Sequence, residues 1–234
     1  NRLADFPHYL MHRAEQLDNL YIFKNTEGTP ENIRKFHPNI IVSSTGSAPL
    51  LPPIAGLKDR IDNENHNIYS ILGMISHIND FPKDLEGKKV VVVGGGAVGL
   101  DVVEFFADRN ADISIVEMMD QIGRDLDPVS KNDTKTMMKK HNVHQLTKTA
   151  LLEVKDSSFL VRGEGEPYEL PFEYGFVCLG MRAQGQLYQN LTEEFSSEDV
   201  EIMNIGDSQR ARRIIDGTQE GRNILTILEQ KGYL

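Results

Sequence analysis

The sequence contains a single cysteine, Cys178, among its 234 residues. One cysteine excludes an internal disulfide, a redox-active cysteine pair and a cysteine ligand set for an iron–sulfur centre within this chain. Cys178 lies in the apolar run Phe-Val-Cys-Leu-Gly, which favours a buried structural thiol over a reactive one.

The sequence also lacks long apolar runs and an excess of positive charge. No apolar run approaches the roughly 18 residues that a membrane-spanning helix needs, and the Asn-Arg-Leu-Ala start does not resemble a secretion signal. The formal net charge of −10 at pH 7 argues against nucleic acid or an anionic membrane as the main partner. We therefore expect a soluble, cytoplasmic protein with no nucleic-acid and no membrane partner.

The chain is long enough to hold one large domain or two small ones and to bury a real core. It contains no internal repeat and no low-complexity tract. Its first residue is neither Met nor an obvious helix cap, although a helical pattern is already under way at residues 2–17. We therefore expect the chain to be cut from a longer polypeptide.

Residues 88–117 carry the pattern of a strand, a glycine-rich turn, a helix and a second strand. Val90–Val93 is a β-branched apolar run, which is typical of a strand covered on both faces. An amphipathic helical stretch runs from residue 97 to about 109, and the second strand, 113–116, ends at Glu117. The three glycines with the spacing G-x-G-x-x-G are Gly94, Gly96 and Gly99.

Each part of this segment has a physical role if a dinucleotide binds there. The first glycine permits a tight turn, the second lets a pyrophosphate approach the backbone, and the third lets the helix pack closely on the sheet. Free N–H groups at the helix start face the phosphates. Glu117, 23 residues after Gly94, can accept hydrogen bonds from an adenosine ribose and would repel a 2′-phosphate. The segment therefore predicts binding of NADH in preference to NADPH.

Periodicity outside this segment predicts an α/β fold with short elements. Residues 144–170 carry alternating apolar and polar positions with turn signals, which predict an antiparallel meander. Residues 57–87, apart from a helical patch at 70–78, resemble a polar linker, and residues 184–198 resemble a polar surface segment. Further strands are expected at residues 21–24, 39–47, 176–179 and 200–207, and further helices at 5–17, from 29–31, at 131–140 and from Asp216, where Gln219 completes a capping box.

Two other strand ends are candidate binding positions. Thr45-Gly46 ends a strand where the backbone can approach a ligand, although an ordinary strand-to-loop glycine is the commoner explanation for such a pair alone. Asp207, after Gly206, can accept hydrogen bonds from sugar-like hydroxyls, although an aspartate there is more often a cap or turn residue. The arginines at 210–222 can meet a phosphate, but a solvated basic loop is the commoner explanation.

Together these patterns resemble the pyridine-nucleotide-dependent flavoprotein reductases. The segments that occur in the order seen in that family are Val-Ser-Ser-Thr-Gly-Ser-x-Pro, the Gly94 unit, Phe-Val-Cys-Leu-Gly-Met-Arg and Ile-Gly-Asp-x-x-x-x-Arg-x-Ile-Ile-Asp-Gly. Residues 117–128 and 212–217 look most like the C-terminal part of the NADH:flavin oxidoreductase, 2,4-dienoyl-CoA reductase and 2-enoate reductase group. The resemblance implies a Rossmann-like NAD(P)-binding domain, residues 66–183, inserted in part of a split FAD-binding domain, residues 1–65 and 184–234.

The resemblance also implies binding roles at the matching positions. Asp101 stands where relatives usually have glutamate near the nicotinamide, and Asp207 would bind the ribityl or pyrophosphate region of FAD. The N-terminal dipole of the helix from Asp216 would stabilise negative charge on a reduced flavin. The positions implied for NADH are Gly94, Gly95, Gly96, Ala97, Val98, Gly99, Asp101, Glu117, Met118 and Gly180. The positions implied for FAD are Thr45, Gly46, Gly206, Asp207, Arg212, Ile214 and Ile215.

The sequence departs from the family in what precedes Thr45. No earlier G-x-G-x-x-G for the ADP half of FAD is present, nor an N-terminal barrel with FMN and a cysteine cluster for a 4Fe-4S centre. We therefore expect the NADH-binding part and the last part of an FAD domain, whose partners are the missing N-terminal domains of the same polypeptide. Alone, such a chain would hold FAD weakly or not at all.

The resemblance implies hydride transfer from NADH to FAD and onward to an enoate, dienoyl-type or other acceptor. Because the cofactors carry this chemistry, no catalytic side chain and no metal ligand is assigned here. A flavin-independent dehydrogenase or a methyltransferase could share the glycine pattern, but the Thr45-Gly46 and Gly206-Asp207 pairs argue against both. A non-catalytic dinucleotide-binding module, or a fragment with an incomplete FAD site, stays open as the alternative.

Overall fold

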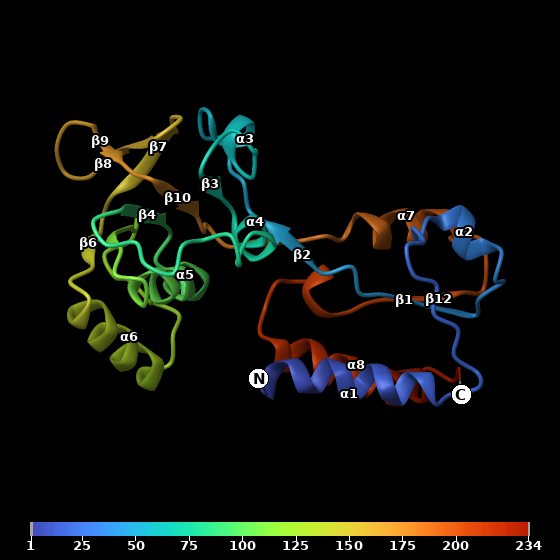
Figure 1. The fold of residues 1–234 in the computed structure, drawn as a ribbon. Helices are drawn as coiled ribbons and strands as arrows, with labels where there is room; N and C mark the ends of the chain where they lie inside the picture. The colour runs from blue at the N-terminus through green and yellow to red at the C-terminus, as the bar shows by residue number, and fades with distance from the viewer. Residues whose placement is uncertain (1, 234) are drawn as a thin grey trace. The chain divides into compact units, whose positions relative to one another are not determined.

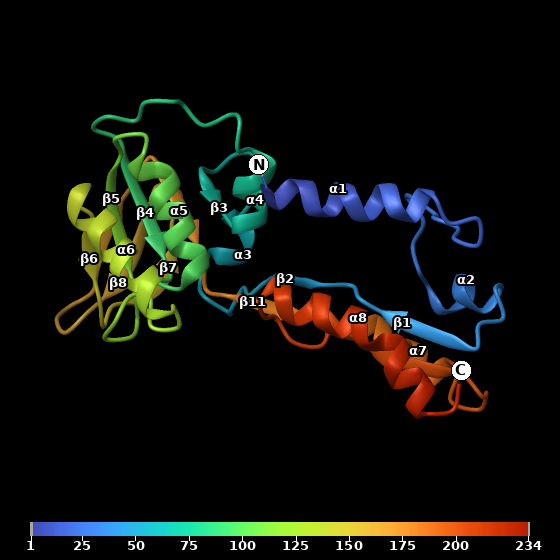
Figure 2. The same ribbon diagram turned by 90° about the horizontal axis from the view of Figure 1, so that it is seen from below.

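The computed structural model describes residues 2–233, which form two compact units (Figures 1 and 2). The first unit comprises Asn1–Ser43 and Gln186–Met203, and the second comprises Ser44–Gly185 and Asn204–Leu234. These units group the chain by compactness, so the predicted cofactor-domain boundaries at residues 65 and 183 stay a prediction.

The second unit is built on a five-stranded parallel sheet with the order β3-β10-β4-β5-β6. Its central strand β4 pairs with β5 on one side, where Val92 lies opposite Ile115, and with β10 on the other, where Val92 lies opposite Phe176. All carboxyl ends therefore meet at one edge of the sheet. The strands are β3 (Ile68–Tyr69), β10 (Tyr174–Val177), β4 (Lys89–Val93), β5 (Asp112–Val116) and β6 (His144–Leu146).

Both faces of this sheet are covered, as the β-branched run of β4 predicts. Val90 and Val92 face a cluster that includes Phe106 of helix α5 (Ala97–Ala107) and Met138 of helix α6 (Pro128–Lys140). Val91 and Val93 belong to a second cluster on the opposite face. Alternate residues of one strand thus anchor two apolar layers, which is the expected pattern for a buried parallel strand.

The second apolar layer comes from an antiparallel meander. The meander predicted for residues 144–170 is confirmed from residue 150 onward, whereas residues 144–146 form β6 of the parallel sheet. Strands β7 (Ala150–Val154), β8 (Ser158–Arg162) and β9 (Tyr168–Pro171) pair in sequence order. Phe159 is fully buried in this layer. Figure 1 shows the meander on the side of the sheet opposite α6.

Residues 57–87 are more than the polar linker that we predict from their composition. They contain helix α3 (Leu57–Arg60), strand β3 at the sheet edge and helix α4 (Ile71–Ser76), whose N-cap is Ser70. Leu57 and Ile68 have no exposed surface. Ile61, Met74, Phe81 and Leu85 are buried as well, so this segment contributes to the core in a way that its polar composition does not reveal.

The remaining elements of the second unit lie outside the five-stranded sheet. A short antiparallel pair joins β2 (Ser47–Pro49) to β11 (Met181–Ala183). A single helical turn, η1 (Gly206–Ser208), precedes helix α8 (Ile214–Gln230). The predicted capping box at Asp216 is wrong in position, because α8 begins two residues earlier and the Asp216 carboxylate accepts a hydrogen bond from Arg213 N at 3.1 Å.

The first unit contains few strands and several helices. Its elements are α1 (Arg2–Glu15), α2 (Pro30–Arg34), β1 (Ile40–Ser43), α7 (Gln186–Glu194) and β12 (Glu201–Asn204), the last residue of which belongs to the second unit. β1 and β12 form a two-stranded sheet. Ile41, Leu191 and Phe195 make its buried cluster.

Two predictions in the first unit are wrong. Residues 21–24 form no strand, because no described strand lies beside them to complete the hydrogen bonds that an extended segment needs. Residues 184–198 are not a plain surface segment, because they form α7 and bury Leu191 and Phe195. None of the described helices combines the length and apolar character that crossing a membrane requires.

Candidate functional site

The glycine-rich turn after β4 is held in a form that only glycine adopts easily. Gly94 has a φ of +111°, and its N–H donates to Val116 O at 2.8 Å. A Cβ at this position would lie 2.1 Å from Cys178 O. The backbone of Cys178, directly after β10, therefore leaves no room for a side chain at the point where the chain leaves β4.

The other two glycines of the pattern have different surroundings. A Cβ at Gly99 would lie 1.9 Å from Gly94 O, so helix α5 packs directly on the turn. A Cβ at Gly96 would meet no atom within 4 Å. Gly96 is the N-cap of α5, and among the described residues no side chain caps this helix start. The open space and the uncapped N–H groups together fit an anionic group such as a pyrophosphate.

Glu117, at the end of β5, ties the turn to the following loop. Its Oε2 accepts from Gly95 N and its Oε1 accepts from Met119 N, both at 2.7 Å. Gly123 N also donates to Gly95 O at 2.7 Å, so the loop after β5 closes on the glycine turn. A carboxylate oxygen can accept a second hydrogen bond, so Glu117 keeps the capacity to bind ribose hydroxyls.

A cavity of about 890 Å³ opens at the carboxyl ends of β4, β5 and β10. This is where ligands bind in parallel α/β sheets, because loops from adjacent strands meet there. Nine of the sequence-predicted positions line it: Gly94, Gly96, Ala97, Val98, Glu117, Met118, Gly180, Asp207 and Arg212. The cavity lining does not include Gly95, Gly99, Asp101, Thr45, Gly46, Gly206, Ile214 or Ile215.

Several cavity residues were not expected from the sequence. Thr149 is buried and lines the cavity beside Glu117, since Thr149 N donates to Glu117 O at 2.9 Å. No local pattern marks such a residue, because its place depends on pairing with a distant loop. The other lining residues that we did not predict are Leu50, Pro52, Ile54, Val93, Val116, Asp125, Ala150, Leu151, Cys178, Leu179, Met181 and Ala211.

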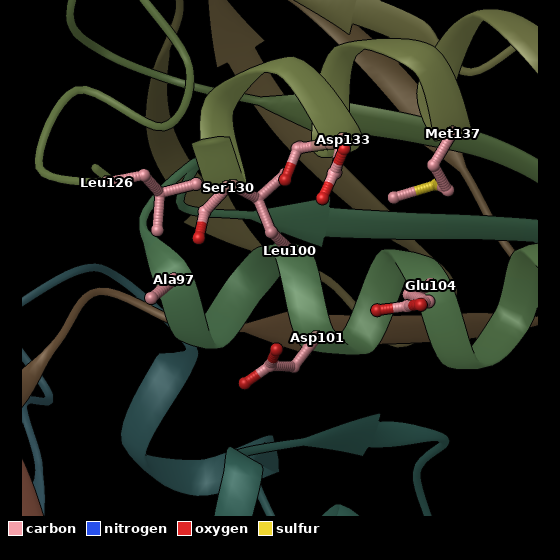
Figure 3. A pocket seen from close by; sticks show the side chains of 9 residues that line it. Ala97, Leu100, Asp101, Glu104, Leu126, Ser130, Asp133 and Met137 are labelled. Carbon is pink, nitrogen blue, oxygen red and sulfur yellow. The ribbon is translucent and has the colours of Figure 1, made fainter. Parts of the chain in front are cut away.

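Asp101 lies in a different, smaller pocket of about 350 Å³ between α5 and α6. Figure 3 shows Asp101 and Glu104 on α5, with Ser130 and Asp133 contributed by α6. Loss of solvent contact, and then the charge of Glu104, raise the pKa of the Asp101 carboxyl. The role of Asp101 near a nicotinamide therefore stays a prediction.

Cys178 is a buried thiol, as predicted. Only 6% of its surface is exposed. Burial, assisted by the negative charge of Asp101, raises the pKa of the Cys178 thiol to about 12. Because the thiolate is the reactive form, this cysteine is inert at neutral pH although it lies in the cavity wall.

The positions predicted for FAD are joined by hydrogen bonds within the second unit. Asp207 accepts from Ser47 Oγ at 3.1 Å and from Arg212 N at 3.0 Å. Thr45 Oγ1 donates to Gln184 O at 2.7 Å, beside the β2–β11 pair. The two strand ends that the sequence singled out are therefore brought together through Ser47.

Glu220 of α8 was not predicted, yet it holds this group in place. Its Oε2 accepts from Gly206 N at 2.6 Å and its Oε1 from Arg212 Nη2 at 2.5 Å. These bonds, the Gly206 N–H first, lower the pKa of the Glu220 carboxyl. At the start of α8, Ile214 and Ile215 are 76% and 53% exposed, an unusual position for two large apolar side chains.

A model of the family described as pyridine nucleotide-disulphide oxidoreductase matches residues 14–203. A metal reductase of Desulforamulus reducens is 26% identical over 258 residues, which cover 94% of this chain and 36% of the relative. An NADH oxidase of Thermoanaerobacter brockii is 27% identical over 192 residues, which cover 82% of this chain and 28% of the relative. The chain thus spans about a third of the length of these curated relatives.

Solved structures show the same fold. A 2-naphthoyl-CoA reductase in complex with 2-naphthoyl-CoA superposes with a TM-score of 0.75 at 21% identity, covering 93% of this chain and 31% of the other. Histamine dehydrogenase from Rhizobium sp. 4-9 superposes with a TM-score of 0.71 at 14% identity, covering 93% and 35%. At these identities the similarity concerns the fold alone.

Proposed function

The chain belongs to the pyridine nucleotide-disulphide oxidoreductase family, and from this premise we propose that it is the NADH-binding part of a flavin-dependent oxidoreductase. Membership of the family implies binding of FAD and of a nicotinamide dinucleotide. The observation that carries the proposal is that one cavity is lined together by the Gly94 turn, Glu117, Gly180 and Asp207.

The residues of this chain would bind and orient the nucleotide. The uncapped start of α5 and the open space at Gly96 would receive the pyrophosphate, where the helix dipole favours negative charge. Glu117 would accept hydrogen bonds from the adenosine ribose, with Met118 beside it. Gly180, which has a φ of +104°, would border the nicotinamide without a side chain in the way. Hydride chemistry is supplied by the bound cofactors.

The chain would provide only part of the FAD site. Asp207 accepts from Ser47 and from Arg212 N, Thr45 donates to Gln184 O, and the exposed Ile214 and Ile215 fit a surface that a flavin would cover. No second glycine pattern is present for the ADP half of FAD. We infer that the missing N-terminal domains of a longer polypeptide complete this site and carry FMN and a 4Fe-4S centre.

The final acceptor would be set outside this chain. The relatives bear names as different as metal reductase and NADH oxidase, and a structural neighbour is a 2-naphthoyl-CoA reductase. Within this range, residues 117–128 and 212–217 favour the 2-enoate and 2,4-dienoyl-CoA reductase group, hence an activated carbon–carbon double bond as acceptor.

The alternative is a dinucleotide-binding module without catalysis, and one experiment separates the two. We would titrate the purified chain with NADH and NADPH by fluorescence, and record absorbance spectra with and without added FAD. We expect NADH binding that Glu117→Ala weakens, with little flavin retained. A second measurement would combine the chain with FAD and with the N-terminal domains of the proposed longer polypeptide. If NADH does not reduce the FAD in that mixture, the module alternative holds.

Two outcomes would overturn the proposal itself. Absence of any nucleotide binding would remove its central claim. Tight FAD binding by the isolated chain, with bleaching of the flavin by NADH, would show that the chain is a complete reductase.

A further inference from the structure

The loop that follows Glu117 brings a second acidic residue, the exposed Asp125, to the lining of the cavity. Asp125 lines the same cavity as Glu117 and Met118. It lies in a tight turn that is closed by a hydrogen bond from Leu126 N to Gly123 O at 3.1 Å, with Gly123 at a φ of +67°. Asp125 is therefore fixed close to Gly123.

This turn is held against the same residue that binds Glu117. Gly123 N donates to Gly95 O, and Gly95 N donates to Glu117 Oε2, both at 2.7 Å. A Cβ at Gly95 would lie 3.0 Å from Glu117 Oε2 and 3.1 Å from Ile122 Cγ1, so strand end and loop meet on either side of Gly95. Glu117 and the turn that holds Asp125 thus meet at Gly95, on the same side of the cavity.

The two carboxylates differ in how their charges are balanced. Each oxygen of Glu117 accepts a hydrogen bond from a backbone N–H, from Gly95 and from Met119. Among residues 2–233, no hydrogen bond or ion pair is made to the Asp125 carboxylate. The cation in the described cavity lining, Arg212, is bound to Glu220. Of the three carboxylates in the cavity lining, Asp125 is the one whose carboxylate makes no hydrogen bond to the described part of the chain.

We propose that Asp125 is a specificity-determining residue that excludes a 2′-phosphate from the adenosine end of the cavity, while Glu117 mainly holds the turn and accepts ribose hydroxyls. This inference rests on the proposed nucleotide-binding function. A 2′-phosphate carries between one and two negative charges at neutral pH, roughly −1.5 to −2 for a phosphomonoester. Repulsion between that charge and a carboxylate in the lining of the same cavity would then separate NADH from NADPH.

The test compares ligands that differ only in the 2′-phosphate. ADP-ribose and 2′-phospho-ADP-ribose would be titrated by calorimetry into the full chain and into three variants, and NADH and NADPH would serve as a second pair. In Asp125→Asn, we expect affinity for the 2′-phosphorylated ligands to rise about five- to tenfold, with a change of less than about twofold for the others. The gain should shrink as NaCl is raised from about 0.05 M to about 0.5 M, because salt screens the repulsion.

Two variants serve as controls. Asp120→Asn removes the same charge from an exposed residue of the same loop that does not line the cavity, and we expect it to leave the affinity ratio unchanged. Glu117→Gln places an amide group against two N–H donors, so we expect weaker binding of both ligands by about tenfold or more. Thermal unfolding of each variant shows whether the chain remains folded.

The outcomes distinguish this inference from the proposed function. If the wild-type chain binds neither ADP-ribose nor NADH, the proposed function fails. If it binds them, and Asp125→Asn keeps the wild-type ratio or Asp120→Asn shifts that ratio equally, the assignment of Asp125 is wrong and the proposed function stands.

Discussion

The two compact units differ in how much of their apolar surface they bury. In the second unit both faces of the five-stranded sheet are covered, and Val90, Val92 and Phe106 have no exposed surface. In the first unit the large apolar side chains with at least 44% of their surface exposed are Phe6, Tyr9, Leu10, Met11, Leu17, Leu20, Tyr21, Ile22, Phe23 and Phe36. So much exposed apolar surface is typical of a region that further protein covers. The contrast shows that the second unit encloses its own core, whereas much of the apolar surface of the first unit is left exposed.

The largest expected effect comes from emptying the core of the second unit. Phe106 is fully buried, with ring centroids of Phe81 and Phe176 at 5.2 and 4.8 Å. We expect Phe106→Ala to lower the free energy of unfolding by about 3–5 kcal/mol, measured by urea denaturation. Tyr21→Ala, at a side chain that is 77% exposed, should change it by less than about 0.5 kcal/mol. Equal losses in the two variants would contradict the contrast between the units.

The next effect separates packing from binding at the glycine turn. We expect Gly99→Ala to cost roughly 2–3 kcal/mol of stability, because its Cβ would meet Gly94 O at 1.9 Å. Gly96→Ala meets no such contact and should change stability by less than about 1 kcal/mol. It should nevertheless weaken NADH binding by about tenfold, because a methyl group enters the space proposed for the pyrophosphate. Normal NADH affinity in a folded Gly96→Ala variant would argue against that placement.

A smaller effect reports on opening of the second unit alone, because Cys178 is the single cysteine of the chain. With its pKa raised to about 12, iodoacetamide labelling at pH 8 should be at least about a hundredfold slower in the folded chain than in urea. Burial favours the neutral thiol, so this contribution to stability is complete below the ordinary thiol pKa of 9.0 and is lost as pH rises toward 12. Rapid labelling of the folded chain would show that the cavity wall opens readily.

The smallest effect concerns the first unit, where Arg34 of α2 forms ion pairs with the segment that contains the end of α7. Arg34 binds Glu194 and Glu198 and lies 4.6 Å from the ring centroid of Phe195. We expect Arg34→Gln to speed chymotrypsin cleavage of the first unit without slowing or speeding labelling of Cys178. Lys35→Gln is the matched control: it removes an exposed pair with Glu31 and a hydrogen bond to Asn32, both within one segment, and it should behave like the wild type. Faster labelling in Arg34→Gln would show that the two units open together.

The elements that the sequence predicts well are those whose pattern reflects local physics. The β-branched run of β4, the glycine spacing after it and the Thr29-Pro30 start of α2 all require particular residues at particular backbone positions. The pattern predicts that helix α6 begins at residue 131, but the helix begins three residues earlier, at Pro128, after the N-cap Asp127. Such errors are small, because the signal lies close to the element.

The errors that matter come from burial and pairing over long distances. Residues 21–24 have the composition of a strand but no described partner, whereas Ile68 becomes an edge strand because β10 lies beside it. The cavity shows the same division, because the sequence predicts the part that is formed by Gly94 and Gly96 of the glycine-rich turn. Thr149, Ala211 and Asp125 join it only through loops brought together by the fold.

The place of β10 in the sheet also decides when the second unit can form during synthesis. β10 lies between β3 and β4, although it follows both β5 and β6 in the chain. Until residues 174–178 have left the ribosome, β4 has one open edge and Gly94 lacks the Cys178 backbone that confines it. Long-range parallel pairing of this kind is slow, and until it occurs the unpaired edge of β4 is prone to aggregation. A nascent chain that stops before Tyr174 should therefore need a chaperone, whereas one that includes Cys178 can close its central sheet.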